Sequence, residues 1–467
     1  MNDYPIDTLI QTLRESSQKR RESFGYEQRR IALTNLAKTV RRNRLEIIAG
    51  LGQDQGKAPD EVDVVEIIPT LSEISHAISH LARWMRPRRV WPTSLMIGTT
   101  TRILPQAKGV VLVIAPWNFP LLLALGPVAS AIAAGNAVVL KPSEMTPATS
   151  ALLVKICAQA FPDGLVQVVE GGPEVSRALL TQRFDHIFFT GSPAVGRIVM
   201  QAAAHHLTPV TLELGGKSPV ILTHDADLVD AARWIVWGKG VNAGQICVAP
   251  DHVFVPQSLL ESFAQTIEAQ FALSYGADVG ASPDYCQIVN QRHFSRLMAL
   301  MDDAVQKGAT VRVFGQDQPE RTKIAPRLLL GTTPEMEISQ EEIFGPLLPL
   351  IPYDDLSDVI SKVNASPKPL ILYIFAKSRS VISQISGATQ SGSVGVNLTL
   401  MPFIHGNIGF GGVGASGMGE GHGRAGFDTF SHLKPVMKNQ FTLLTLLFPP
   451  YGSRVKRMVR LLLAYLK

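Results

Sequence analysis

Three short stretches of this chain carry residue types that together could do covalent chemistry on a carbonyl group. Cys247 lies in a glycine-flanked loop ahead of a strand-like run, which predicts an accessible thiol nucleophile. Glu213 stands in an otherwise apolar strand, where burial would raise its pKa and suit it to act as a general base. Asn118 lies in the turn Pro116–Pro120, and its amide could donate to an oxyanion beside the backbone N–H of Cys247.

Each of these residues also has a purely structural interpretation. A lone buried cysteine is usually a small hydrophobic residue, as we expect for Cys157 in a helical run, whereas Cys286 looks incidental in a turn. Glu213 could instead form a salt bridge or bond to the glycine turn after it, and Asn118 could be an ordinary turn residue. For reaction near neutral pH, Cys247 would need an electropositive setting that lowers its pKa.

Composition places the chain among ordinary globular proteins. Its 467 residues are 46% hydrophobic and 18% charged, and the formal net charge of +5 is modest for this length, so we expect no nucleic-acid partner. Three widely spaced cysteines fit neither a disulfide framework nor a metal motif, and we expect a reducing compartment and no metal. No basic-then-apolar leader and no apolar run near the ~20 residues of a membrane span are present, which favours a cytoplasmic protein.

The order of patterns along the chain predicts the fold class. Helical periodicity runs from Ile6 to about Met85, and alternation over 96–104 predicts a strand or connecting ribbon. From Gly109 strands and helices alternate, which predicts a parallel sheet covered on both faces, and a second such run extends from Val220 to about Asn397. The glycine-rich segment 406–426 is predicted to be a long loop. We therefore expect two doubly wound α/β domains with a small β element between or beside them.

The sequence signals for a nucleotide-binding site are weaker than those for the three candidate catalytic residues. The first strand-turn-helix lacks the Gly-x-Gly-x-x-Gly fingerprint, which argues against an ordinary Rossmann site. The run from Thr190 to Gly196 does follow a strand and open a helix, where free N–H groups could hold a phosphate. Lys141 and Glu144 follow another strand and could reach a ribose.

Taken together, these stretches resemble the aldehyde dehydrogenase superfamily across nearly the whole chain. The motifs that carry the resemblance are Ala115-Pro116-Trp117-Asn118-Phe119-Pro120, Lys141-Pro142-Ser143-Glu144, Phe189-Thr190-Gly191-Ser192, Leu212-Glu213-Leu214-Gly215-Gly216-Lys217-Ser218-Pro219, Gly244-Gln245-Ile246-Cys247, Glu341-Glu342-Ile343-Phe344-Gly345-Pro346 and Phe410-Gly411-Gly412-Val413-Gly414. They occur in the family's order. The residues Cys247–Asp251 and Phe427–His432 favour the class 3 branch, which includes fatty, aromatic and coniferyl aldehyde dehydrogenases.

The resemblance implies a role for each motif. Cys247 would attack an aldehyde, Asn118 would hold the oxyanion, and Glu213 would activate water to hydrolyse the thioester. The residues it assigns to an NAD cofactor site are Trp117, Lys141, Glu144, Gly191, Ser192, Gly196, Glu342 and Phe344. Because the acidic Glu144 disfavours a 2′-phosphate, NAD is preferred, with NADP as the alternative.

The resemblance also implies a division of the chain. Residues 1–95 and 105–212 would form the NAD(P)-binding domain, and 213–398 the catalytic domain. Residues 96–104 and 399–440 would form bridging or oligomerisation segments of a homodimer, and 441–467 an amphipathic tail.

One segment departs from the class 3 pattern. Members usually carry an acidic residue directly after the asparagine that matches Asn397, whereas this chain has Leu398. That loop lines the substrate tunnel in the family, so a medium- or long-chain aliphatic or an aromatic aldehyde is expected without a choice between them. Two other functions stay open: an acylating or phosphorylating semialdehyde dehydrogenase, which generally lacks the base at Glu213, and a non-catalytic protein with the same fold.

The C-terminal tail has its own pattern. Apolar residues at 455, 458, 459, 462, 463 and 466 share one helical face, and Arg454, Lys456, Arg457 and Arg460 lie largely off it. Such a helix could dock on its own subunit or across a dimer. Alternatively, residues 453–467 could make peripheral contact with an anionic membrane, at the inner surface.

Overall fold

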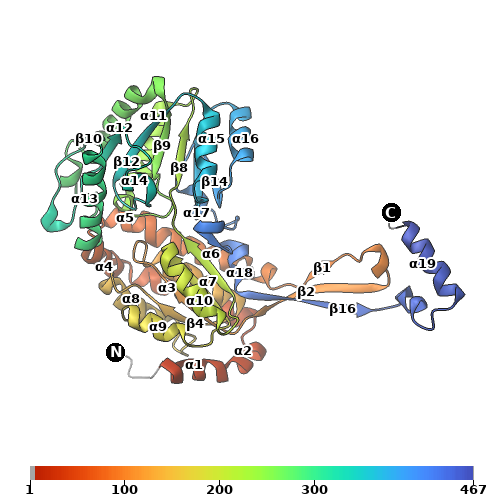
Figure 1. The fold of residues 1–467 in the computed structure, drawn as a ribbon. Coiled ribbons are helices and arrows are strands. Elements are labelled where there is room, and N and C mark those ends of the chain that lie inside the picture. The colour runs from red at the N-terminus through yellow and green to blue at the C-terminus, as the bar shows by residue number, and fades with distance from the viewer. Residues whose placement is uncertain (1–5, 466–467) are drawn as a thin grey trace.

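The computed structural model describes residues 6–465, apart from the side chain of Gln18. Two α/β units lie one above the other, and a long β arm projects sideways from the lower unit and ends near helix α19 (Figure 1). The predicted fold class is confirmed in outline, because two largely parallel sheets are each covered by helices. Among the described residues, no helix is long and apolar enough to cross a bilayer.

The lower unit is built on a six-stranded sheet. Its strands, in spatial order, are β15 (Gly417–Met418), β7 (Val210–Leu214), β6 (His186–Gly191), β3 (Val110–Ile114), β4 (Ala137–Lys141) and β5 (Val166–Val168). All neighbours pair in parallel except β15, which runs antiparallel to β7. Strand β3 is buried at all five positions, as expected for a strand covered on both faces.

Helices cover both faces of this sheet. They are α1 (Ile6–Glu15), α2 (Ser17–Ser23), α3 (Tyr26–Arg42), α4 (Arg44–Gln55), α6 (Ile68–Trp84), α7 (Leu122–Ala134), α8 (Pro147–Ala160), α9 (Pro173–Leu180), α10 (Pro193–Ala204) and α18 (Gly423–Thr429). Helix α7 contacts α3, α6 and α18 as well as strands β3 and β4. Because α7 is enclosed on all these sides, nearly all of its residues are apolar and buried.

The upper unit is built on a seven-stranded sheet. Its order is β10 (Thr310–Val313), β11 (Arg327–Leu330), β12 (Leu347–Tyr353), β9 (His252–Pro256), β8 (Pro219–Leu222), β13 (Ile371–Phe375) and β14 (Ser393–Val396). Only β10 runs antiparallel to its neighbour. The helices of this unit are α11 (Leu228–Gly240), α12 (Leu260–Tyr275), α13 (Gln291–Gln306), α14 (Glu337–Gln340), α15 (Leu356–Ala365), α16 (Arg379–Ala388) and α17 (Met401–Ile404).

The arm is a three-stranded antiparallel sheet. It consists of β1 (Arg88–Val90), β2 (Thr99–Ala107) and β16 (Ser431–Asn439), with β2 in the middle. The expected strand at 96–104 is therefore shifted toward the C-terminus, because a 3₁₀ turn occupies 94–96. The predicted long loop at 406–426 is also interrupted, since β15 joins the six-stranded sheet and α18 begins at Gly423.

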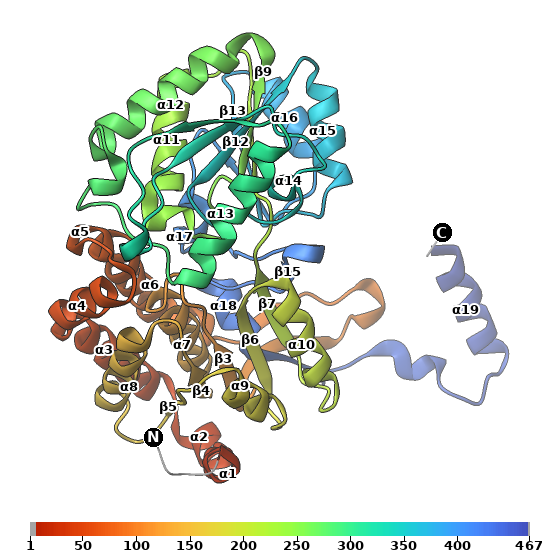
Figure 2. The same cartoon turned by 60° about the vertical axis from the view of Figure 1, so that its left-hand side comes forward.

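The tail forms the predicted helix, α19 (Ser453–Tyr465). It packs against the short 3₁₀ helix η8 (Leu443–Leu447) beyond the end of the arm, and Figure 2 shows it well away from both units. Val455 is buried there, whereas Leu461, Leu463 and Tyr465 stay exposed. Leu466 and Lys467 lie outside the described residues.

The root of the arm is fixed to the six-stranded sheet by Asn136, which is fully buried. Its side-chain N–H groups donate to Phe430 O (2.9 Å) and Ala131 O (3.1 Å), and its Oδ1 accepts from Gly109 N (2.8 Å). One side chain thus joins the end of α7, the start of β3 and the residue that precedes β16.

We expect Asn136→Ala to lower the free energy of unfolding by about 2–4 kcal/mol, because it leaves buried polar groups of three segments without partners. Urea unfolding followed by circular dichroism measures the loss. The exposed Asn364, which donates to Ala388 O at 2.8 Å, is the matched control, and Asn364→Ala should cost less than about 0.5 kcal/mol. Equal losses in the two variants would contradict the structural role given to Asn136.

Candidate active site

Cys247 follows a backbone turn of an uncommon kind. Asn242, Ala243 and Gly244 all have positive φ, at 52°, 50° and 72°. Left-handed backbone costs energy in residues other than glycine, so two of the three positions store strain next to the candidate nucleophile. A side chain at Gly244 would place its Cβ 2.5 Å from Gly345 O, so this position also allows a close approach of two loops.

Buried amide groups hold this turn against the turn that carries Asn118. Asn242 Nδ2 donates to Asn118 O and to Gln245 O, both at 3.0 Å. Asn118 Nδ2 donates to the same Gln245 O at 3.0 Å. The backbone N–H of Asn242 donates to Glu61 Oε1 at 2.8 Å. The predicted convergence of Asn118 with Cys247 is therefore built through Gln245, two residues before the thiol.

An ion pair with no solvent exposure supports the Asn118 turn from the other side. Lys57 Nζ lies 2.9 Å from Glu66 Oε1 and donates to Asn118 O at 2.9 Å. Glu66 Oε2 accepts from Leu122 N at 3.0 Å, at the start of α7. Burial raises the pKa of Glu66, and the Lys57 ammonium opposes that rise. Removing one partner of such a pair leaves the other charge buried and uncompensated.

The side-chain amide of Asn118 uses only one of its N–H groups in the hydrogen bonds described above. A side-chain amide carries two N–H groups. One points to Gln245 O, and within residues 6–465 no acceptor is found for the other. Because Asn118 is buried, this group is shielded from bulk water in the cavity that it shares with Cys247.

Glu213 lies in β7, as its position in the sequence predicted. It pairs with Thr190 of β6 on one side and with Gly417 of β15 on the other. Burial, with a smaller contribution from the nearby Glu420 carboxylate, raises the pKa of Glu213 to about 8, and the Gly421 N–H opposes this. Its Oε1 atom is buried and has no hydrogen-bond partner in the described part of the chain, although it lines a cavity.

The surroundings of Cys247 do not lower the pKa of its thiol. Burial raises the pKa of its thiol to about 12, and the carboxyl groups of Glu342 and Glu213 act in the same direction. The other two cysteines are buried in the hydrophobic core, with pKa values also raised by burial. Cys157 packs as predicted, but Cys286 is not incidental, since its Sγ lies 3.9 Å from Asn242 Oδ1 under the strained turn.

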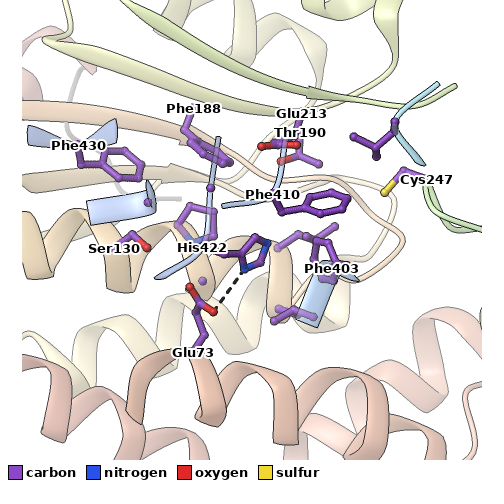
Figure 3. A pocket seen from close by; sticks show the side chains of 17 residues that line it. Glu73, Ser130, Phe188, Thr190, Glu213, Cys247, Phe403, Phe410, His422 and Phe430 are labelled. Carbon is purple, nitrogen blue, oxygen red and sulfur yellow. Dashed lines mark hydrogen bonds and ion pairs between the residues drawn. The ribbon is translucent and has the colours of Figure 1, made fainter. Parts of the chain in front are cut away.

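Three cavities meet at Cys247. One, of about 120 Å³, is lined by apolar side chains that include Phe119, Trp237 and Phe403. A second, of about 210 Å³, contains Asn118 and Glu213 together with Cys247. A third, of about 30 Å³, lies beside Glu213 and is drawn in Figure 3.

Figure 3 shows a pair that sequence reasoning missed, Glu73 and His422, on the far side of Phe410 from Glu213. His422 Nδ1 lies 3.3 Å from Glu73 Oε2, and Gly423 N donates to Glu73 Oε1 at 3.1 Å. The ring of His422 packs edge-on against Phe403, with centroids 4.7 Å apart. The pair thereby holds part of the aromatic wall between two cavities. Neither residue lies in a motif that carried the resemblance.

Five of the eight predicted cofactor residues line the 210 Å³ cavity: Trp117, Gly191, Ser192, Glu342 and Phe344. Ser192 caps helix α10, since its Oγ accepts from Val195 N at 3.4 Å. Trp117 and Phe344 meet edge to face, with ring centroids 5.3 Å apart. Phe344 has a positive φ of 51°, another strained position at the site.

Two lining residues of this cavity lie outside all of the motifs that carried the resemblance, His293 and Arg296 of α13. His293 packs on Trp117 at 5.2 Å, and burial lowers its pKa to about 4, so its ring is neutral. Arg296 donates to the backbone oxygens of Glu342 and Ile343, which fixes the loop that carries Glu342. Histidine and arginine at these positions have no spacing signal that singles them out.

The other three predicted cofactor residues lie outside that cavity lining. Lys141 is buried, and its Nζ donates to Pro142 O at 2.6 Å and to Glu144 Oε2 at 3.4 Å. Glu144 is partly exposed, with 40% of its side chain accessible. Gly196 faces β7: a Cβ there would lie 2.7 Å from Leu214 Cδ2, so glycine lets α10 pack close to the sheet.

The cavity fits a polar, ring-bearing cofactor. Glu342 Oε1 and His293 Nε2 are buried and have no hydrogen-bond partner among the described residues. Burial raises the pKa of Glu342 to about 8, with the nearby Asp251 adding to the rise. Buried polar atoms without partners are costly, so groups that supply hydroxyls and donors at this place would be favoured.

Comparisons with known proteins agree with this geometry. The sequence pattern of the "Aldehyde dehydrogenase family" matches residues 5–436. The chain is 43% identical over 416 residues to a "Probable coniferyl aldehyde dehydrogenase" of Pseudomonas aeruginosa, covering 88% of this chain and 87% of that one. It is 42% identical over 406 residues to "Aldehyde dehydrogenase family 3 member A2" of Pongo abelii, covering 87% and 82%.

Solved structures give the same result. A substrate-bound AldH of Staphylococcus aureus superposes with a TM-score of 0.93 at 35% identity, covering 98% of this chain and all of that one (100%). A Mycobacterium tuberculosis aldehyde dehydrogenase complexed with NAD+ superposes with a TM-score of 0.83 at 27% identity, covering 94% and 90%. The chain therefore belongs to the aldehyde dehydrogenase family, in the branch of the coniferyl and family 3 enzymes, and it is an oxidoreductase that acts on aldehydes.

Proposed function

We propose that this enzyme oxidises an apolar aldehyde to a carboxylic acid through a thioester on Cys247. The observation that carries the proposal is the meeting of one thiol, one amide donor and one carboxyl group at a single cavity, from Cys247, Asn118 and Glu213. These are the parts needed to attack a carbonyl, stabilise the oxyanion and activate water. Of the two other functions suggested by the sequence, an acylating or phosphorylating enzyme would make a different product and a non-catalytic protein would make none, and both are separated below.

In the first half-reaction, the thiol of Cys247 gives its proton to solvent water and its sulfur bonds to the aldehyde carbon. The free N–H of Asn118 and the backbone N–H of Cys247 stabilise the resulting oxyanion. Trp117, Ser192, Glu342 and Phe344 would hold the cofactor, which when bound would supply a hydride acceptor beside the same carbon. Loss of hydride would leave that carbon as a thioester on the sulfur of Cys247.

In the second half-reaction, water hydrolyses the thioester. Glu213, as the carboxylate, takes a proton from the water while the oxygen bonds to the acyl carbon, and the thiol is released as the acid forms. A pKa near 8 suits this step, because a base works best when its pKa lies near the working pH. Water must enter beside Glu213, whose Oε1 is free to accept it.

The apolar cavity supports the substrate class. Its lining, from Val64 and Phe119 to Trp237 and Ile404, offers hydrocarbon and aromatic surface near Cys247 and almost no polar group. Burying apolar area there would favour a medium- or long-chain aliphatic or a coniferyl-type aromatic aldehyde. We propose NAD as the cofactor, with NADP as the alternative.

We expect Glu213→Gln to slow thioester hydrolysis about 10²–10⁴-fold, in the range of a lost general base. In the unmodified enzyme, hydrolysis should rise with pH through about 8, because the carboxylate form of Glu213 is needed. The variant should lose that rise. Stopped-flow release of acid across pH 6–10, with intact mass spectrometry of the acyl-enzyme, measures both.

Cys247→Ala is the control and should form no acyl-enzyme. Assays run without coenzyme A or phosphate also separate the alternatives. Acid and reduced cofactor without either compound support hydrolysis. Turnover only with coenzyme A or phosphate would indicate an acylating or phosphorylating enzyme, and no turnover at all would indicate a non-catalytic protein.

The preference for NAD has its own test at Glu144. Its carboxylate accepts from Lys141, so the pair would present a negative oxygen to a 2′-phosphate. We expect Glu144→Gln to lower the KM for NADP about 5- to 20-fold relative to that for NAD, because a like-charge repulsion is removed. Steady-state kinetics with both cofactors measure the ratio. The control is Glu170→Gln, and an unchanged ratio in Glu144→Gln would contradict the assignment.

For the arm and the tail we propose two contacts. Strand β16 is a free sheet edge, exposed at eight of its nine positions, and such an edge can pair with a second copy of the chain. Helix α19 exposes Leu461, Leu463 and Tyr465 beside Arg454, Lys456, Arg457 and Arg460, which suits an anionic membrane surface.

We expect the protein truncated after Gly452 to pellet with vesicles of 30% phosphatidylserine at least about fivefold less than the full chain, because the truncation removes apolar side chains and five cations. Equal pelleting would contradict a membrane role for α19. Light scattering of both proteins should give the mass of a dimer. A monomer in both would contradict pairing through β16.

A further inference from the structure

A second large cavity lies at the N-terminal ends of the parallel strands of the six-stranded sheet, whereas the active site lies at their C-terminal ends. Its volume is about 690 Å³, and it is lined by the turns that lead into β3, β4, β6 and β7 and by α2 and α3. Glu213 and the Asn118 turn lie at the other ends of the same parallel strands. A strand of five residues spans roughly 16 Å, so a ligand in this cavity would not reach Cys247.

The lining is strongly basic. Five lysine and arginine side chains, Arg20, Arg21, Arg29, Lys108 and Arg183, line the cavity against a single carboxylate, Asp185. That carboxylate is already engaged, since Asp185 Oδ2 accepts from Val110 N at 2.8 Å and Oδ1 lies 3.7 Å from Arg14. We call this the basic cavity.

Lys108 is the most unusual of these cations. Its Nζ lies 3.1 Å from His186 Nδ1, and His186 Nε2 lies 3.0 Å from Thr211 Oγ1. Burial lowers the pKa of His186 to about 3, so its ring is neutral, Nδ1 accepts from the ammonium and Nε2 donates to the hydroxyl. Lys108 is thus oriented by an uncharged partner and keeps further N–H donors for the cavity. Burial lowers its pKa to about 8, with no carboxylate offsetting the effect.

Arg29 is held in place by the backbone. Its Nε donates to Phe24 O at 2.9 Å and its Nη1 to Ala133 O at 3.0 Å. Its Nη2 packs on Gly135, where a Cβ would lie only 2.5 Å away, so glycine makes room for the guanidinium. Burial lowers the pKa of Arg29 to about 10.

Helix C-termini explain part of this arrangement. Strand starts lie near helix ends in an α/β unit, and cations are favoured at the negative end of a helix. Arg29 donates to Ala133 O in the last turn of α7, and Arg20 donates to Leu13 O in the last turn of α1. Within the described residues, Lys108, Arg21 and Arg183 make no such bond. The cavity therefore holds more positive charge than the helix C-termini account for.

We propose that the basic cavity binds a small, multiply charged anion of the polyphosphate class. Cations contributed by separate segments surround a space large enough for at least two phosphate groups. Fixed guanidinium groups suit phosphate oxygens, and the lysine supplies a point charge. The basic cavity is distinct from the proposed cofactor cavity, because the two lie at opposite ends of the strands of one sheet.

Isothermal titration of the full chain with inorganic tripolyphosphate, at ionic strength held constant with NaCl, tests the proposal. We expect one saturable site per chain that persists when NAD is present in excess. Lys108→Gln with Arg183→Gln should weaken binding at least about tenfold, since two of the five cations are lost. Arg88→Gln with Arg89→Gln, which removes two exposed cations from β1 of the arm, should leave it within about twofold.

If the double variant fails to fold, the single Arg183→Gln variant takes its place, because Arg183 is exposed. This variant should weaken tripolyphosphate binding about threefold or more. Absence of saturable binding, displacement by NAD, or equal loss in the cavity and arm variants would overturn the proposal. Equal loss would mean that net charge alone attracts the anion.

Discussion

The site depends on one buried polar network that joins two turns from different units. Asn242 and Asn118 both donate to the carbonyl of Gln245, and Lys57 with Glu66 fixes the Asn118 turn from behind. Such a network is stable only when each member has a partner. Because Gln245 precedes the thiol by two residues, satisfying the network also places Cys247. The strain at Asn242 and Ala243 is the cost of that placement.

The electrostatic environment of the site favours the protonated forms of its acidic groups. Burial raises the pKa of Glu213 and of Glu342 to about 8, and that of the Cys247 thiol to about 12. The carboxyl groups of Glu342 and Glu213 also disfavour ionisation of the Cys247 thiol and so add to the rise in its pKa. A positive charge brought into the cavity would lower all three pKa values. The resting thiol is therefore protected from chance reactions.

Much of the fold follows from local sequence. The alternation of strands and helices expected from Gly109 onward is present, beginning with β3 at 110–114 and including helix α8 at 147–160, because local apolar patterns predict such elements. Segment 406–426 was predicted less well. Its glycines indicate a loop, but β15 forms only because Gly417 pairs with Glu213 of a distant strand, which no local pattern reveals.

The candidate site, like the fold, could be predicted only in part from the sequence. Cys247, Glu213 and Asn118 could be singled out because their types are uncommon in their settings. Lys57 and Glu66 could not, because in the sequence they are two more charges in a helical region. Only the tertiary structure shows that neither side chain is exposed. The carboxyl groups near Cys247 could not be placed from the sequence for the same reason, since they come from β7 and from the loop after α14.

The root of the arm has a mechanical consequence. Phe430, which lines the small cavity beside Glu213, is the residue directly before β16, and its carbonyl is held by Asn136. A load on the arm therefore reaches the cavity wall across one peptide bond, with no hinge segment to absorb it. A second copy of the chain that paired with β16 would therefore also restrain the cavity wall next to Glu213, so that dimerisation and the shape of this cavity would be mechanically linked.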